Sequence, residues 1–114
     1  MSQDIAIIGI GLFPFGRHEG VNAIQMGVSA ANRALDDAGV RWQDIHFACA
    51  GALEVTQPDA MIKFMGLTGI PFTSIFNGCA TGGSLLLNAS HAIAAGAGDI
   101  GIAVGFDKHP RGAF

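Results

Sequence analysis

The sequence has no tyrosine, only two cysteines and few charged residues. Charged residues make up 13% of its 114 residues, and the formal net charge is −3. No cluster of lysines or arginines is present, which argues against nucleic acid and against an anionic membrane as partners. Two cysteines do not make the framework of a small secreted disulfide domain, so we expect a reducing, cytoplasmic compartment. Without tyrosine, any tyrosine-based chemistry would have to come from elsewhere.

Charge is missing altogether from one long stretch. Residues 64–98 contain no Asp, Glu, Lys or Arg. Pro71, Asn77 and Asn88 interrupt the stretch, so it never reaches the run of about 20 apolar residues that a membrane-spanning helix needs. We therefore expect no membrane span, and we attribute the missing charge to structural elements that are buried on all sides.

Four short apolar runs predict strands of one sheet. They contain apolar residues without polar alternation, which is typical of strands covered on both faces. Half of the whole sequence is hydrophobic, and a chain of this length suffices for one domain with a core but not for two. The predicted strands are residues 5–10, 45–50, 72–76 and 100–104.

Helical segments separate the four runs. In residues 21–38, apolar or small residues recur every three or four positions, and Gly39 is a typical helix end. Residues 59–65 predict a short helix, and residues 83–95 are apolar around most of the helix circumference, which predicts a helix buried on all sides. The order βαβαβαβ predicts an α/β fold with a mostly parallel sheet and helices on both faces.

Cys79 is the strongest candidate for a functional residue. It follows the apolar run that ends at Asn77 and Gly78, and a small-residue turn after it opens into the third helix. A thiol at such a corner faces the free N–H groups and the positive end of the helix, a setting that favours the nucleophilic thiolate. The commonest fate of a free cysteine is that of a small buried hydrophobe, which suits Cys49 in its apolar run. We therefore predict a reactive Cys79 and an inert Cys49.

Other motifs have plainer readings. Gly9 and Gly11 begin a dinucleotide-binding pattern, but its third glycine would fall at Pro14, so we predict a tight turn instead. Asp107 and Lys108 follow the fourth predicted strand, at the sheet edge where sites gather, and we expect them to be solvated loop charges. None of the histidines has the spacing of a metal site, so we predict no metal and assign structural roles to all four: His18, His46, His91 and His109.

Four segments, in this order and with this spacing, resemble the thiolase superfamily. The chain looks most like the lipid-transfer-protein or sterol-carrier type of thiolase. The resemblance spans the whole chain but only about the first third of a family member. It therefore implies that residues 1–114 are an incomplete N-terminal half-domain, with no second domain. The four segments are IAIIGIGLFPFGR (5–17), ALDDAGV (34–40), GCATGGS (78–84) and VGFDK (104–108).

The resemblance also implies a function. In thiolases two similar halves pack as a five-layer sandwich, with the helix after the cysteine buried at its centre. Cys79 would take an acyl group from acyl-coenzyme A as a thioester, and its own backbone N–H would help to stabilise the oxyanion. Coenzyme A thioester is then a substrate, and no covalently bound cofactor is implied. The strand from Thr73 to Phe76 would form the contact of a homo-oligomer.

The chain departs from the family at three points. It has no counterpart of the Gly-His-Pro segment whose histidine activates the nucleophile, or of the Cys-x-Gly turn that supplies the acid/base cysteine. The segment thought to hold coenzyme A is also absent. His109 and Pro110 mimic the dipeptide, but Lys108 precedes them just after the fourth strand, so we do not transfer the role. We expect the isolated chain to lack thiolase activity.

Three functional hypotheses follow. The first is a thiolase-type acyltransferase with Cys79 as its nucleophile. The second is a thiolase-like retro-aldolase that cleaves steroid side chains with an accessory subunit, with its decisive residues outside this chain. The third is a non-catalytic lipid- or acyl-coenzyme A-binding chain that completes its fold with a partner. Acyl or steroid specificity and reaction direction stay open.

Overall fold

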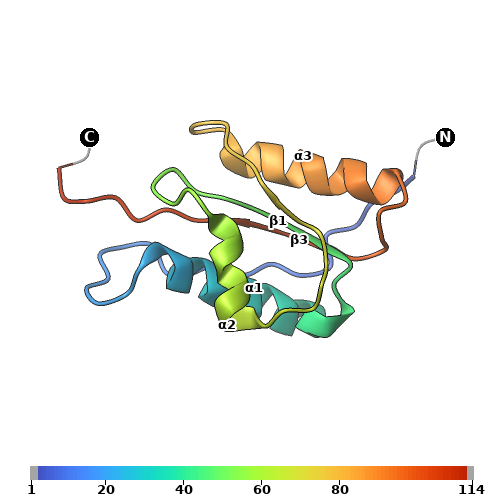
Figure 1. Cartoon of the computed structure of the whole chain (residues 1–114), viewed down its shortest axis with the longest axis horizontal. Coiled ribbons are helices and arrows are strands. Elements are labelled where there is room, and N and C mark those ends of the chain that lie inside the picture. The colour runs from blue at the N-terminus through green and yellow to red at the C-terminus, as the bar shows by residue number, and fades with distance from the viewer. Residues whose placement is uncertain (1–2, 113–114) are drawn as a thin grey trace.

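The computed structural model describes residues 3–112, which form three layers (Figure 1). A parallel sheet lies in the middle. Helix α3 (Thr81–Ala94) covers one of its faces. Helix α1 (Ala23–Ala38) and the short α2 (Ile62–Met65) cover the other. This arrangement confirms the predicted α/β class with helices on both faces of a parallel sheet.

The sheet has three strands in the order β2-β1-β3. The central strand β1 (Phe47–Gly51) is buried along its whole length. It pairs with β2 (Phe72–Ser74) on one side and with β3 (Gly101–Gly105) on the other, so that Cys49 lies opposite Thr73 and Ala103. Because β2 and β3 each pair only with β1, both are edge strands.

The predicted first strand does not form. Residues 5–10 have no strand pairing, and β1 and β3 are joined directly over five residue pairs, so no place is left between them. The segment lies instead along α1, where a Cβ at Gly9 would come within 2.5 Å of the carbonyl oxygen of Ala34. The backbone N–H of Ile10 donates to the carboxylate of Asp37 at 2.9 Å. This part of the prediction was wrong, and the glycines explain the close approach to the helix.

Helix α1 closely matches the predicted 21–38. Asn22 caps its start, because the side chain accepts a hydrogen bond from the N–H of Gln25, whose own side chain accepts one from the N–H of Asn22. Gly39 ends it in the left-handed conformation with φ of 69°, a geometry that costs glycine little. Residues of the inner face, including Ala31 and Leu35, are buried against the sheet.

The bounds of the remaining elements lie within three residues of the predicted ones. The segment predicted as a short helix is a 3-10 turn, η2 (Pro58–Met61), followed by α2. The third helix begins at Thr81, two residues earlier than predicted, so the turn at Cys79 leads into it almost at once. A further 3-10 turn, η1 (Trp42–Asp44), precedes β1. The Trp42 indole N–H donates to the carbonyl of Gly66 at 2.9 Å and joins this turn to the end of α2.

Helix α3 is covered on one face only within the described residues. Leu85 is buried against the sheet, but Leu86 is 51% exposed and Leu87 is 57% exposed. The prediction of a helix buried on all sides therefore does not hold for residues 3–112 by themselves. No helix among these residues has both the length and the apolar character to cross a membrane. The outer face of α3 is an apolar surface for which this part of the chain supplies no cover.

Candidate active site

Cys79 lies between β2 and α3, in the loop at one end of α3 (Figure 1). Cys79 is exposed, and its side chain is a free thiol. The carboxyl end of β2 leads into this loop, so Cys79 occupies the edge of the parallel sheet where ligands of such sheets bind. The predicted strand-to-helix corner is therefore present.

A single threonine organises the turn. The Thr81 hydroxyl accepts a hydrogen bond from the backbone N–H of Asn77 at 2.8 Å and donates to the carbonyl of Gly78 at 2.8 Å. The backbone adds a bond from the N–H of Ala80 to the carbonyl of Asn77 at 3.0 Å. Gly78 takes a left-handed φ of 55°, which a residue with a Cβ rarely adopts. Together these bonds define a tight turn that presents Cys79.

The start of α3 leaves room beside that turn. No side chain caps the first turn of the helix. A Cβ placed at Gly82 or at Gly83 would meet nothing within 4 Å, so the backbone is open to an approaching molecule. The free N–H groups of a helix start carry a partial positive charge that attracts anions. One polar contact borders the opening, from the side-chain amide of Asn77 to the hydroxyl of Ser84 at 2.9 Å.

Cys49 has the opposite environment. It is 1% exposed in the central strand, and its thiol donates to the carbonyl oxygen of Leu85 at 3.5 Å. Burial raises the pKa of the Cys49 thiol to about 11, because desolvation disfavours the thiolate. The structure thus confirms that Cys49 is a buried packing residue, whereas Cys79 is exposed and its reactivity stays a prediction.

The charges that follow β3 are structural ties, not free loop charges. The Asp107 carboxylate accepts hydrogen bonds from the backbone N–H groups of Leu53 and Glu54, in the loop after β1. The Lys108 ammonium donates to the carbonyls of His18 and Val21, ahead of α1. These two side chains join the three loops at the carboxyl edge of the sheet. No local pattern in the sequence indicates these bonds, since their partners lie more than 50 positions away.

Three of the histidines make polar contacts within the chain. Nδ1 of His46 accepts from the backbone N–H of Asp99 at 2.9 Å, and Nε2 of His18 lies 2.7 Å from the carbonyl of Pro14. His109 lies 3.6 Å from the Glu54 carboxylate, and His91 lies in the last turn of α3. Within residues 3–112, no three His, Cys, Asp or Glu side chains gather as the ligands of a metal ion would.

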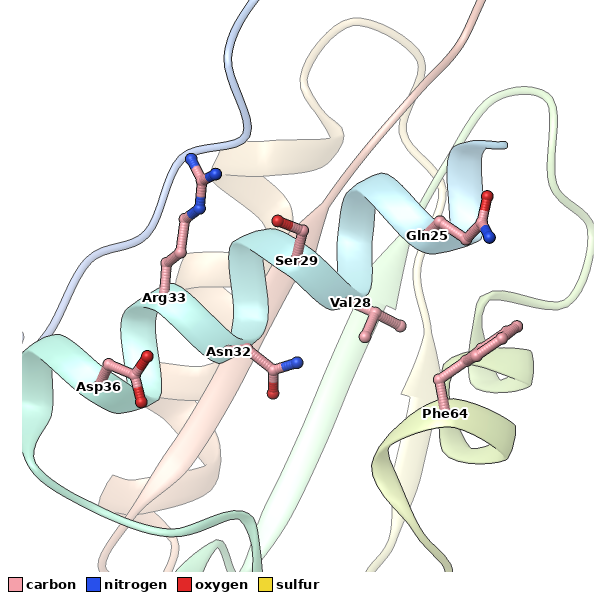
Figure 2. Close-up of a pocket in the computed structure, with 7 residues that line it drawn as sticks. All are labelled: Gln25, Val28, Ser29, Asn32, Arg33, Asp36 and Phe64. Carbon is pink, nitrogen blue, oxygen red and sulfur yellow. The ribbon is translucent and has the colours of Figure 1, made fainter. Parts of the chain in front are cut away.

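Open cavities of the described residues lie away from Cys79. One, of about 770 Å³, is bordered by residues 11–19 and by the segment that follows β3. Another, of about 390 Å³, lies between α1 and Phe64 of α2 (Figure 2). Polar side chains of α1 such as Gln25 and Asn32 border it. Cys79 lines neither of these two cavities.

The fold belongs to the thiolase-fold class. One similar structure is 3-oxoacyl-[acyl-carrier-protein] synthase III from Aquifex aeolicus, with a TM-score of 0.72 at 16% identity over 79% of this chain and 31% of that chain. The priming β-ketosynthase of the R1128 polyketide pathway has a TM-score of 0.67 at 24% identity, over 74% of this chain and 27% of that chain. The C143S form of Xanthomonas campestris OleA, solved with lauric acid and lauroyl-CoA, has a TM-score of 0.66 at 18% identity, over 82% of this chain and 29% of that chain.

Homologous proteins point to the same superfamily as the structures. Sterol carrier protein 2 from Gallus gallus is 28% identical over 98% of this chain and 21% of its own length. An acetyl-CoA acetyltransferase from Methanothermobacter thermautotrophicus is 34% identical over 93% of this chain and 30% of its own length. Non-specific lipid-transfer protein-like 2 from Caenorhabditis elegans is 31% identical over 95% and 27%.

These matches confirm the resemblance to thiolases of the sterol-carrier and lipid-transfer type. No profile of a known protein family matches the sequence. The chain spans between about a fifth and a third of the length of the relatives it matches. The comparisons therefore establish the fold and the homology of this segment.

Proposed function

We propose that Cys79 is the nucleophile of a thiolase-type acyltransferase that acts on acyl-coenzyme A. The observation that carries the proposal is the contrast between the two thiols. Cys79 is exposed beside the uncapped start of α3, whereas Cys49 is 1% exposed and is bonded to Leu85. The acetyl-CoA acetyltransferase among the relatives and the lauroyl-CoA bound to a protein of the same fold support this class of substrate.

The proposed step is an exchange of thioesters. The Cys79 thiolate attacks the carbonyl carbon of the acyl thioester, a new C–S bond forms, and the C–S bond to coenzyme A breaks. The coenzyme A thiolate leaves and takes up a proton. Backbone N–H groups at the turn, that of Cys79 among them, would stabilise the negative oxygen of the tetrahedral intermediate. No oxidant or reductant is needed.

Residues 1–114 would act as an N-terminal half-domain of the complete enzyme. The uncovered apolar face of α3, with Leu86 and Leu87, supports this proposal, because a face of this kind is covered in a finished fold. The histidine that activates the nucleophile and the second cysteine would come from outside these residues. We therefore propose that the chain alone is acylated slowly and does not carry out thiolysis or condensation.

Incubation of the full chain with an acyl-coenzyme A, followed by intact-mass measurement and peptide mapping, tests the assignment. We expect one acyl group on Cys79, with release of free coenzyme A. Cys79→Ala should abolish the modification, and Cys49→Ala, the matched control, should leave it unchanged. Acylation of Cys49 at the rate of Cys79 would contradict the proposal. Carbon–carbon bond cleavage that survives Cys79→Ala in the complete protein would favour a retro-aldolase instead.

A lipid-binding role without catalysis is the second candidate, and one observation favours it. The leucines of the outer face of α3 are exposed, as is Phe76 after β2, at 62%, and two kinds of relative are named for sterol carriage or lipid transfer. A chain of this kind would bind an acyl-coenzyme A without transferring the acyl group. Binding of a non-hydrolysable acyl-coenzyme A analogue that is unaffected by Cys79→Ala, together with no acylation of the wild type, would support it.

We also propose that the chain associates through the strand from Thr73 to Phe76. Strand β2 is at the edge of the sheet and pairs on one side only, so its outer backbone groups can pair with a second copy. Thr73, Ser74 and Phe76 are exposed. An accessory subunit would be a further partner of the completed protein.

Both cysteines are free thiols, which supports a reducing, cytoplasmic compartment.

A further inference from the structure

We infer that Thr81 is the positioning residue of the Cys79 nucleophile, acting through its hydroxyl on the peptide group between Gly78 and Cys79. The inference rests on the proposed function of Cys79 and adds to it a residue that the sequence shows only as part of a small-residue turn. Thr81 does not react with substrate in this scheme. It determines the direction in which the turn presents its backbone N–H groups and its thiol.

The hydroxyl of Thr81 bonds to two peptide groups ahead of Cys79, the one between Phe76 and Asn77 and the one between Gly78 and Cys79. It accepts from the N–H of Asn77 and donates to the carbonyl of Gly78, each at 2.8 Å. The backbone N–H of Thr81 reaches the same Gly78 carbonyl at 3.3 Å. In a trans peptide the N–H points opposite to the C=O, and none of the described peptide bonds is cis. Holding the Gly78 oxygen toward Thr81 therefore directs the N–H of Cys79 away from it, as an oxyanion donor requires.

The methyl group of Thr81 anchors the same side chain to the sheet. A Cβ added to Gly51, the last residue of β1, would lie 2.5 Å from the Thr81 methyl carbon and 2.2 Å from the carbonyl oxygen of Ile75. The methyl therefore packs directly on the backbone at the end of the central strand. The carbonyl of Gly51 is itself held by the N–H of Phe106 at 3.1 Å. Threonine has few rotamers, so packing of the methyl group restricts the hydroxyl to one direction.

The conformational freedom of Gly78 is the reason that the turn needs the hydrogen bonds to Thr81. Its left-handed φ of 55° is one of several conformations open to glycine, so the turn would reorient easily without the bonds to Thr81. Loss of the hydroxyl should let the Gly78 peptide rotate and change the setting of the Cys79 thiol, with little effect on the packing of α3. The predicted consequence is a change in thiol reactivity that is separate from a change in stability.

A comparison of four residues at position 81 separates the effect of the hydroxyl from the effect of the methyl. Threonine has both groups, Thr81→Val keeps the methyl, Thr81→Ser keeps the hydroxyl, and Thr81→Ala keeps neither. In the full chain, the rate of alkylation by iodoacetamide is measured at each cysteine by peptide mapping, from neutral to mildly alkaline pH. We expect Cys79 to react about fivefold more slowly in the Val and Ala variants, the effect of losing one hydrogen bond. The Ser variant should resemble the wild type.

Two controls distinguish positioning from general loosening. Cys49 reports opening of the fold because it is 1% exposed, and its alkylation should stay unchanged in all four proteins. Ser90→Ala removes another hydroxyl of α3, which donates to the carbonyl of Leu86 at 2.9 Å, and it should leave Cys79 unaffected. If Thr81→Val fails to fold, the Ser and Ala pair still isolates the hydroxyl.

The inference is overturned if Cys79 is alkylated as fast in the Thr81→Val protein as in the wild type, and as fast in Thr81→Ala as in Thr81→Ser. It is also overturned if the alkylation rate of Cys49 changes together with that of Cys79. It is equally overturned if Ser is as slow as Val, because the hydroxyl would then not be the cause. Iodoacetamide requires no acyl substrate. A wild type that is never acylated by acyl-coenzyme A would therefore reject the proposed function while the role of Thr81 in the turn is still decided by alkylation.

Discussion

The thiol of Cys49 donates to the main-chain carbonyl of Leu85 at 3.5 Å and thereby joins the central strand to α3. Leu85 is also the buried residue of that helix, with 1% exposure. The contact therefore lies under the one face of α3 that is covered. It places a titratable group in the core, and the ionisation of this group has consequences for stability.

Stability should fall in alkaline solution because of Cys49. Burial raises its pKa from 9.0 to about 11, so between these values the folded state holds a proton that the unfolded state has released. The contribution is complete below pH 9.0 and is lost as the pH rises through about 11. Two pKa units correspond to about 3 kcal/mol in the free energy of unfolding. Urea unfolding across this pH window measures the loss.

Cys49→Ala is the control for that measurement. It removes the titrating group, so its stability should be lower at neutral pH but should decline less between pH 9.0 and about 11. An equal alkaline decline in the variant and the wild type would assign the loss to other groups.

Gly51→Ala should destabilise the fold and disturb the turn before Cys79. The added Cβ would meet the carbonyl oxygen of Ile75 at 2.2 Å and the methyl of Thr81 at 2.5 Å, and the carbonyl oxygen cannot move without displacing the backbone. Overpacking of this kind costs about 1–3 kcal/mol in the free energy of unfolding. Thermal or urea unfolding measures it. Gly83→Ala is the matched control, since its Cβ meets nothing and the helix gains up to about 1 kcal/mol. Equal effects of the two would contradict the packing argument.

The helix α1 and the contrast between the cysteines could be predicted because their signals are local. Apolar spacing and Gly39 define the helix, and the residues next to Cys79 and Cys49 distinguish a corner from a buried run. The strand at residues 5–10 was predicted wrongly because strand formation depends on a neighbour. Its apolar side chains suit a strand, but β1 pairs directly with β3, and residues 5–10 pack along α1 without pairing to any strand.

The contacts of Thr81 and Asp107 were missed for different reasons. A threonine two positions after a strand-end cysteine can bond back to the preceding backbone, so the signal at Thr81 was present in the sequence but is common in turns. Asp107 bonds to the loop after β1, at a separation of 53 and 54 residues. Only the parallel topology brings these loops together, so no local pattern could have indicated the bond.

Asp107→Ala should loosen the loop that follows β1. The carboxylate accepts from the N–H groups of Leu53 and Glu54, and losing one hydrogen bond of this kind corresponds to about fivefold faster local opening. Hydrogen exchange measured at these two amides should accelerate, while the amides in the middle of α1 keep their rates. Asp107→Asn retains the Oδ1 acceptor and should exchange nearly as the wild type does. Acceleration spread evenly over the chain would indicate global destabilisation and contradict a local tie.

Ser74→Pro should dissociate the proposed homo-oligomer without unfolding the chain. The N–H of Ile75 donates to the carbonyl of Ala50 at 3.0 Å, toward β1. N–H directions alternate along a strand, so that of Ser74 points to the open side, where a proline is tolerated at a sheet edge. Light scattering after size exclusion should show the wild type as an oligomer and the variant as a monomer with unchanged circular dichroism. Thr73→Pro, whose lost N–H points toward β1, should instead lower the unfolding temperature. A monomeric wild type, or a Ser74→Pro protein that remains associated, would reject β2 as the contact.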